Sequence, residues 1–185
     1  MNNKNFIDRN IDGSLVIPEY LLNSTPLKNH SELMVIEEDG RLILVPSIHS
    51  LSRLYVEPTS TCNLNCVTCI RSNWHEESGF MDMTVFHTLI EQVRDFKTIG
   101  SVMFSGFGEP LSHPHILDMI KAFSDLGLNT EVTTNGTLLD DDMVDGLFDA
   151  GLNDLWVSID SVTPNKFNEI REGGDFDQVY QNLKK

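Results

Sequence analysis

The sequence predicts an α/β protein built as a partial (β/α) barrel, with parallel strands inside and helices outside. From about residue 51 to the end of the 185-residue chain, short β-rich segments alternate with amphipathic segments of helical spacing. This alternation is typical of a parallel sheet covered by helices. Polar and glycine-bearing residues follow each β-rich segment, where α/β folds place their ligands. The strand–helix units are too few to close an eight-stranded barrel, so we expect the N-terminal part of a longer protein.

Residues 1–50 differ from the rest and are predicted to form a small N-terminal β appendage. Residues 33–36 and 42–45 have strand character, and the intervening EEDG supplies a hairpin turn. The earlier residues are rich in asparagine, contain two prolines and are expected to be irregular. The predicted domains are therefore residues 1–50 and residues 51–185.

The predicted strands share a β-rich composition and a polar C-terminal end. They lie at residues 53–58, 101–106, 129–136 and 155–160. The predicted helices show apolar residues three or four positions apart, and most have a cap or a stop. They lie at residues 83–96, 113–127, 138–151, 163–174 and 175–185.

Particular residues support individual helices. The first has Phe86, Ile90 and Val93 on one face, and the second ends at Gly127. The third is rich in acidic residues near its start, where they complement the helix dipole. The fourth has Pro164 in its first turn, a position that proline favours.

Charge and composition restrict the partners. The chain has a formal net charge of -15, with 40% hydrophobic and 22% charged residues. Such an acidic surface repels phosphate backbones and anionic lipids, so we expect neither a nucleic acid nor a membrane as partner. No apolar run reaches the length of a membrane span, and the N-terminus lacks the features of a signal peptide. We therefore expect a cytoplasmic location.

Three cysteines, Cys62, Cys66 and Cys69, lie within the segment TSTCNLNCVTC. An odd number of closely spaced cysteines argues against a disulfide framework. The spacing C-x-x-x-C-x-x-C can hold three corners of an iron–sulfur cluster. Zinc is the alternative, with His75 as a fourth ligand. The cysteines alone leave both interpretations open.

Further motifs follow the predicted strands: SGFGEP after the second, TTNG after the third and SID after the fourth. Together with CNLNCVTC, they resemble the radical S-adenosylmethionine (radical SAM) enzymes over residues 51–185. The resemblance implies a barrel of the radical SAM type and a 4Fe–4S cluster on Cys62, Cys66 and Cys69, whose open iron binds S-adenosylmethionine (SAM). It also implies reductive cleavage of SAM to a radical that abstracts hydrogen from a substrate.

SGFGEP is similar to the Gly-Gly-Glu-Pro segment of that family, which holds the methionine amino group. The resemblance assigns this role to Gly108 and Glu109 and makes Gly106 a further candidate for cofactor binding. The sequence departs from the family at Phe107, which replaces the first glycine, although Gly106 stands one residue earlier. The alternative is a β-to-α turn with an acidic helix start.

The other strand ends are similar to regions that bind the ribose and the methionyl group, which assigns Asn135, Ser158 and Asp160 to cofactor binding. For Asn135-Gly136 a simple turn is the alternative. Arg171 is expected to pair with a carboxylate, unless it is a solvated surface residue. Thr68 is a second departure, because the family often has an aromatic residue there.

The resemblance is strongest to maturation enzymes, including those proposed to act on tungsten-cofactor oxidoreductases. It implies a peptide, protein or cofactor precursor as substrate and a ferredoxin or flavodoxin as electron donor. Trp74 and His75 are candidates to face the same mouth. Two alternatives remain: a non-catalytic zinc- or iron–sulfur-binding module, and an incomplete catalytic domain.

Overall fold

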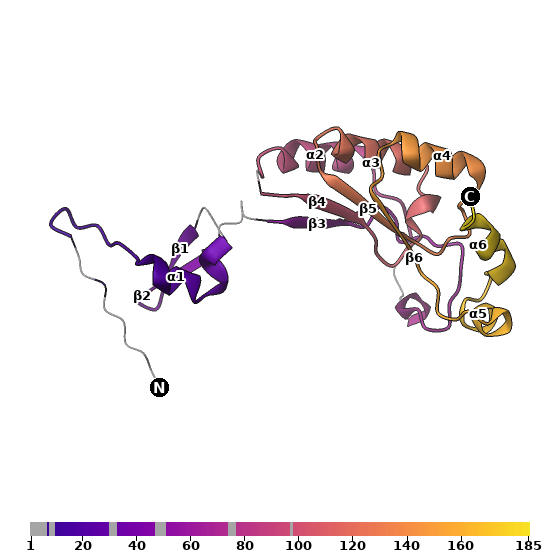
Figure 1. Ribbon diagram of the computed structural model, residues 1–185, viewed down its shortest axis with the longest axis horizontal. Coiled ribbons are helices and arrows are strands. Elements are labelled where there is room, and N and C mark those ends of the chain that lie inside the picture. The colour runs from indigo at the N-terminus through magenta and orange to yellow at the C-terminus, as the bar shows by residue number, and fades with distance from the viewer. Residues whose placement is uncertain (1–6, 8–9, 30–32, 47–50, 74–76, 97) are drawn as a thin grey trace. The chain divides into compact units, whose positions relative to one another are not determined.

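The computed structural model describes the chain apart from residues 1–6, 8–9, 30–32, 47–50, 74–76 and 97 (Figure 1). The chain divides into two compact units, Met1–Ser50 and Leu51–Lys185. Trp74 and His75 lie outside the described residues, so the structure does not test their predicted place at the mouth. In the described part of the chain, no helix combines the length and the hydropathy needed to cross a bilayer.

The first unit contains the predicted hairpin. Strands β1 (Leu33–Glu38) and β2 (Arg41–Pro46) pair antiparallel. Asp39 and Gly40 form the turn with φ values of 49° and 71°, a left-handed conformation that tight hairpin turns require. The prediction of a hairpin with its turn at EEDG is confirmed, and each strand is longer than the sequence indicated.

The segment before the hairpin is not wholly irregular, and this expectation was wrong. It contains the short helix α1 (Glu19–Asn23) and the 3-10 turn η1 (Pro26–Asn29). The hydroxyls of Ser24 and Thr25 donate hydrogen bonds of 2.8 Å to carbonyl oxygens at the end of α1. A helix of five residues is too short to display an amphipathic repeat, so no periodic pattern marks it in the sequence.

The second unit is built on a parallel sheet, as predicted. Strands β3 (Arg53–Val56), β4 (Ser101–Phe104), β5 (Asn129–Thr134) and β6 (Asp154–Val157) lie in the order β3-β4-β5-β6. All neighbouring pairs are parallel. Consecutive strands therefore end at the same edge of the sheet, where the predicted site residues begin.

Helices cover one face of this sheet. Helices α2 (Met83–Val93), α3 (Ile116–Ser124) and α4 (Asp141–Asp149) form a layer over it (Figure 1). The core lies between the two layers. Its most buried large side chains come from both, and they include Phe86, Phe104, Ile116, Met119, Ile120, Phe123 and Val132. The predicted apolar helix faces are thus the faces that pack on the sheet.

Capping groups set the helix boundaries. The carboxylates of Asp82 and Asp140 accept backbone hydrogen bonds in the first turns of α2 and α4. The helix expected at 113–127 begins later, at Ile116, because the buried His113 ring is used in a turn. Its Nε2 lies 3.1 Å from the carbonyl oxygen of Met81, and its Nδ1 accepts from the His115 amide.

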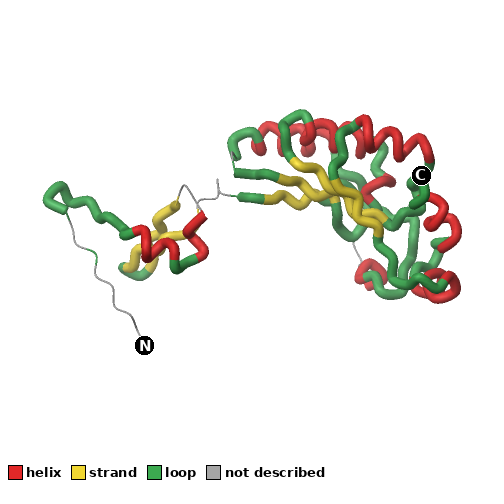
Figure 2. The backbone as a smooth tube through the Cα atoms, viewed as in Figure 1, coloured by secondary structure: helices red, strands yellow, loops and turns green. Residues whose placement is uncertain are grey.

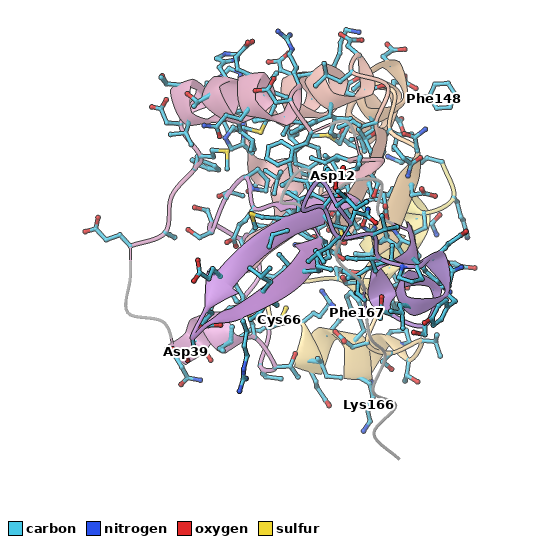
Figure 3. All side chains as sticks on the ribbon, turned by 90° about the vertical axis from the view of Figure 1, so that its left-hand side faces the viewer. Asp12, Asp39, Cys66, Phe148, Lys166 and Phe167 are labelled. Carbon is cyan, nitrogen blue, oxygen red and sulfur yellow. The ribbon has the colours of Figure 1, made fainter. Side chains whose placement is uncertain are left out.

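The opposite side of the sheet carries the cysteine loop and the last two helices, α5 (Pro164–Ile170) and α6 (Phe176–Asn182). The connection from β3 to α2 is mostly loop, with the 3-10 turn η3 (Ile70–Asn73) within it (Figure 2). In Figure 3, Phe148 projects from the helical layer at the top of the view, and Cys66 and Phe167 lie in the lower part of the view.

Candidate functional site

A cavity lies at the carboxyl ends of the strands and is lined by the loops that follow β3, β4, β5 and β6. Among the described residues, the predicted cluster- and cofactor-binding residues all line it except Asp160. The lining residues are Cys62, Leu64, Cys66, Thr68, Cys69, Ser105, Gly106, Phe107, Gly108, Glu109, Thr133, Thr134, Asn135, Ser158 and Arg171. The structure therefore brings together segments more than a hundred residues apart.

The cysteine loop is held against two other elements. The amides of Asn65 and Val67 donate to the carbonyl oxygens of Glu172 (2.8 Å) and Ile170 (2.9 Å) at the end of α5. The carbonyl oxygen of Thr61 accepts from the Glu109 amide at 2.8 Å. The loop that carries the cysteines is thus fixed by backbone hydrogen bonds, which do not depend on side-chain identity.

Cys62, Cys66 and Cys69 are free, half-buried thiols. Burial raises the pKa of the Cys66 thiol; the Arg171 guanidinium opposes this, and the neighbouring thiols and Asp160 add to it. Three thiolates gathered in one cavity repel one another. Positively charged metal ions would relieve that repulsion, so the donor set suits a metal group with thiolate ligands.

The grouping of these thiols bears on which metal group fits. Across the described residues, no three histidine, cysteine, aspartate or glutamate side chains are close enough to hold a single metal ion. A four-iron cluster makes a different demand, because three thiolates bind three separate irons at its corners. The zinc alternative requires His75, which lies outside the described residues. The three thiols fit the demand of the cluster.

The loop after β4 comes very close to the cysteine loop at Gly108. A Cβ atom there would overlap the backbone of Thr59 and Thr61. Glycine is therefore needed at this position for the approach of the two loops.

Gly106 and Phe107 show how the loop accommodates its departure from the family pattern. Gly106 has a φ of 152° and lies against the side chain of Glu57. The Glu57 carboxylate accepts a 2.5 Å hydrogen bond from the Phe107 amide. Phe107 itself is 46% exposed at the edge of the cavity. Glu57 was not predicted as a site residue, because it falls inside the strand expected at residues 53–58, whereas β3 ends at Val56.

Glu109 lies inside the protein, with 2% of its surface exposed. Its carboxylate accepts hydrogen bonds from the Leu111 amide (3.1 Å), the Thr134 hydroxyl (2.7 Å) and the Asn135 amide (2.7 Å). Burial raises the pKa of this carboxyl, and these three donors and Arg171 oppose the rise. Glu109 thus ties the end of β4 to the end of β5. One of its roughly four lone-pair positions is left for a ligand.

Arg171 follows α5 and is not a solvated surface residue, since its side chain is 13% exposed. Its Nε donates to Asp160 Oδ2 at 2.6 Å, and its guanidinium lies 5.9 Å from the ring centre of Phe167. Asp160 is outside the cavity lining, and the structure brings it to Arg171 rather than to the cavity. The terminal nitrogens of Arg171 are the donors available for an anionic ligand.

Comparison with known proteins identifies the class. The family model of the radical SAM superfamily matches residues 56–185, and the chain belongs to this superfamily. Membership implies a 4Fe–4S cluster and SAM, and the cysteine spacing of the family is present at Cys62, Cys66 and Cys69.

Two curated relatives give the sequence context. The chain is 36% identical, over 120 residues, to the tungsten-containing aldehyde ferredoxin oxidoreductase cofactor-modifying protein of Pyrococcus furiosus, covering 65% of this chain and 33% of that protein. It is 34% identical, over 127 residues, to GTP 3',8-cyclase of Chlorobaculum tepidum, covering 68% of this chain and 38% of that protein. The chain thus spans 33% and 38% of the length of these two relatives.

The fold comparison agrees with the family. Streptococcus suis SuiB bound to its precursor peptide SuiA matches with a TM-score of 0.62 and 23% identity, over 73% of this chain and 30% of that chain. At this identity the likeness shows the fold, which is the partial radical SAM barrel predicted from the sequence.

Proposed function

We propose that this chain forms the cofactor-binding part of a radical SAM enzyme that acts in a maturation pathway. The observation that carries the proposal is the single cavity shared by three free thiols, buried Glu109 and half-buried Arg171. When bound, the cluster and SAM supply one-electron reductive cleavage of a carbon–sulfur bond, chemistry that no side chain provides.

The side chains of the cavity have distinct proposed roles. The three cysteines hold the cluster, and the Arg171 guanidinium binds the SAM carboxylate while Asp160 orients it. Glu109 and the backbone at Gly108 accept hydrogen bonds from the SAM amino group, and Ser158 contacts the ribose.

The relatives support a proposal for the substrate class. One relative is named as the cofactor-modifying protein of a tungsten-containing oxidoreductase, another is named GTP 3',8-cyclase, and SuiB was solved bound to a precursor peptide. We propose a peptide, protein or cofactor precursor as substrate. A small ferredoxin or flavodoxin is the proposed electron donor. Because this chain has a net charge of -15, docking of the donor would depend on a local basic patch on the chain. A reducing cytoplasm suits thiols that must stay free to bind iron.

Anaerobic reconstitution tests the proposal. The protein is loaded with iron and sulfide, then given SAM and dithionite, and iron, sulfide, zinc and 5′-deoxyadenosine are measured. We expect about four irons and four sulfides per chain, as a 4Fe–4S cluster requires, together with 5′-deoxyadenosine. Cys66→Ser should lose the cluster. Thr68→Ala should retain it, because Thr68 lines the same cavity but carries no thiol.

Two other outcomes distinguish the alternatives. Zinc without a reconstitutable cluster would refute the proposal. A cluster that forms but yields no 5′-deoxyadenosine would favour an incomplete catalytic domain, and a longer chain would then be assayed in the same way.

A further inference from the structure

Asn135 lies at the end of β5 with 6% of its surface exposed, and its side chain makes four hydrogen bonds. Its Oδ1 accepts from the Thr137 amide (3.0 Å) and the Thr137 hydroxyl (2.7 Å). Its Nδ2 donates to Asn63 Oδ1 (2.8 Å) and to Cys62 Sγ (3.8 Å). Every hydrogen-bonding position of the amide is therefore directed at the protein, a poor arrangement for a residue that binds ribose.

The orientation of this amide is fixed by its neighbours. A backbone amide can only donate, so the oxygen of Asn135 must face Thr137. Its nitrogen must then face the cysteine loop, where Asn63 takes one of the two N–H groups and Cys62 the other. Asn63 Nδ2 donates in turn to the Thr137 hydroxyl at 2.7 Å, which closes the network.

Cys62 differs from the other two cysteines in its hydrogen bonds. Its sulfur also accepts from the Leu64 amide at 3.5 Å. Within the described part of the chain, no hydrogen bond reaches the sulfur of Cys66 or Cys69. Two donors thus converge on one of the three ligand sulfurs. The Leu64 donor belongs to the backbone and the Asn135 donor to a side chain, so a substitution can remove the Asn135 donor.

We propose that Asn135 is a positioning residue that raises the reduction potential of the cluster by donating a hydrogen bond to Cys62 Sγ. The inference rests on the proposed function, because it requires a cluster on the three cysteines. Reduction adds negative charge that spreads onto the thiolate sulfurs, and an N–H donor stabilises the reduced state more than the oxidised state. Removing the donor makes the cluster harder to reduce.

The expected effect is the contribution of one hydrogen bond. At a fixed ambient potential, the ratio of reduced to oxidised cluster should fall about fivefold in Asn135→Ala. For a one-electron couple, at 59 mV per tenfold, this is a shift of about 40 mV to more negative potential. Asn135→Asp keeps the two acceptor bonds to Thr137 but replaces the donor with a negative charge, so its shift has the same sign and is larger.

The test is an anaerobic redox titration of the reconstituted chain without SAM, with the reduced cluster followed by electron paramagnetic resonance. Thr137→Val is the matched control. It removes the hydroxyl from the network but leaves the backbone bond to Asn135 Oδ1 and the bond to Cys62 in place. We expect its ratio of reduced to oxidised cluster to stay within about twofold of wild type, well below the effect of one lost hydrogen bond.

The outcomes separate this inference from the proposed function. An unchanged potential in both Asn135 variants, with the cluster intact, would overturn the inference and leave the proposed function standing. Equal shifts in Asn135→Ala and Thr137→Val would also overturn it, because the network and not the bond to Cys62 would then be responsible. Failure of the wild-type chain to form a cluster would refute both. If Asn135→Ala fails to form the cluster, the potential of Asn135→Asp is the test. A more negative potential supports the inference, and an unchanged potential overturns it.

Discussion

Gly108→Ala tests the close approach of the β4 loop to the cysteine loop. The added methyl group would overlap the carbonyl oxygens of Thr59 and Thr61, which belong to the backbone and cannot rotate away. Overpacking of this kind costs about 1–3 kcal/mol. Parting the loops also weakens the hydrogen bond from the Glu109 amide to Thr61, worth about 1 kcal/mol. We therefore expect the free energy of unfolding to fall by about 2–4 kcal/mol.

The assay is urea unfolding of the metal-free chain followed by far-ultraviolet circular dichroism, with Gly79→Ala as the matched control. Gly79 has an ordinary φ, and a Cβ there would meet nothing within 4 Å. Its substitution should change the free energy of unfolding by no more than about 0.5 kcal/mol. Equal effects of the two substitutions would refute the close approach. Gly108→Ala should also lower iron loading, because the displaced loop carries Cys62.

Two further predictions concern charged groups of the cavity. Arg171→Lys loses the forked guanidinium and its bond to Asp160, so we expect SAM to bind the reconstituted protein about tenfold to a hundredfold more weakly by calorimetry; an unchanged dissociation constant would remove Arg171 from the site. For Glu109, burial raises the folded-state pKa, so its stabilising contribution is full below the ordinary value of about 4.3 and is lost as pH rises through the raised value. The free energy of unfolding of wild type minus that of Glu109→Gln should therefore decrease with pH above about 4 in urea titrations; an increase would contradict this direction.

Local signals were enough to predict the sheet, the helical layer and the place of the cavity. The alternation of strands and helices fixes which ends of the strands meet, and the cysteines and SGFGEP fall at those ends. Contacts between distant side chains carry no such signal. Glu109 with Thr134, and Arg171 with Asp160, are paired by tertiary packing, so the sequence could predict their residue types but not their partners.

The same limit explains why the surroundings of Asn135 and Glu57 were not predicted from the sequence. Asn135 was predicted from a motif that is also a turn signal, and only the structure shows that its amide faces Cys62. Glu57 stood outside every motif, yet it holds the loop at the position where Phe107 departs from the family pattern.

The backbone bonds between the cysteine loop and α5 also link the order of one segment to the order of the other. The last carbonyl groups of a helix have no partner within it. Here the Val67 amide donates to the carbonyl of Ile170, the last residue of α5, and the Asn65 amide donates to the carbonyl of Glu172 just beyond it. Opening the loop would therefore expose the C-terminal turn of the helix to water. Amide hydrogens in the two segments should exchange as one cooperative unit, so any event that immobilises the cysteines would also slow exchange around Arg171.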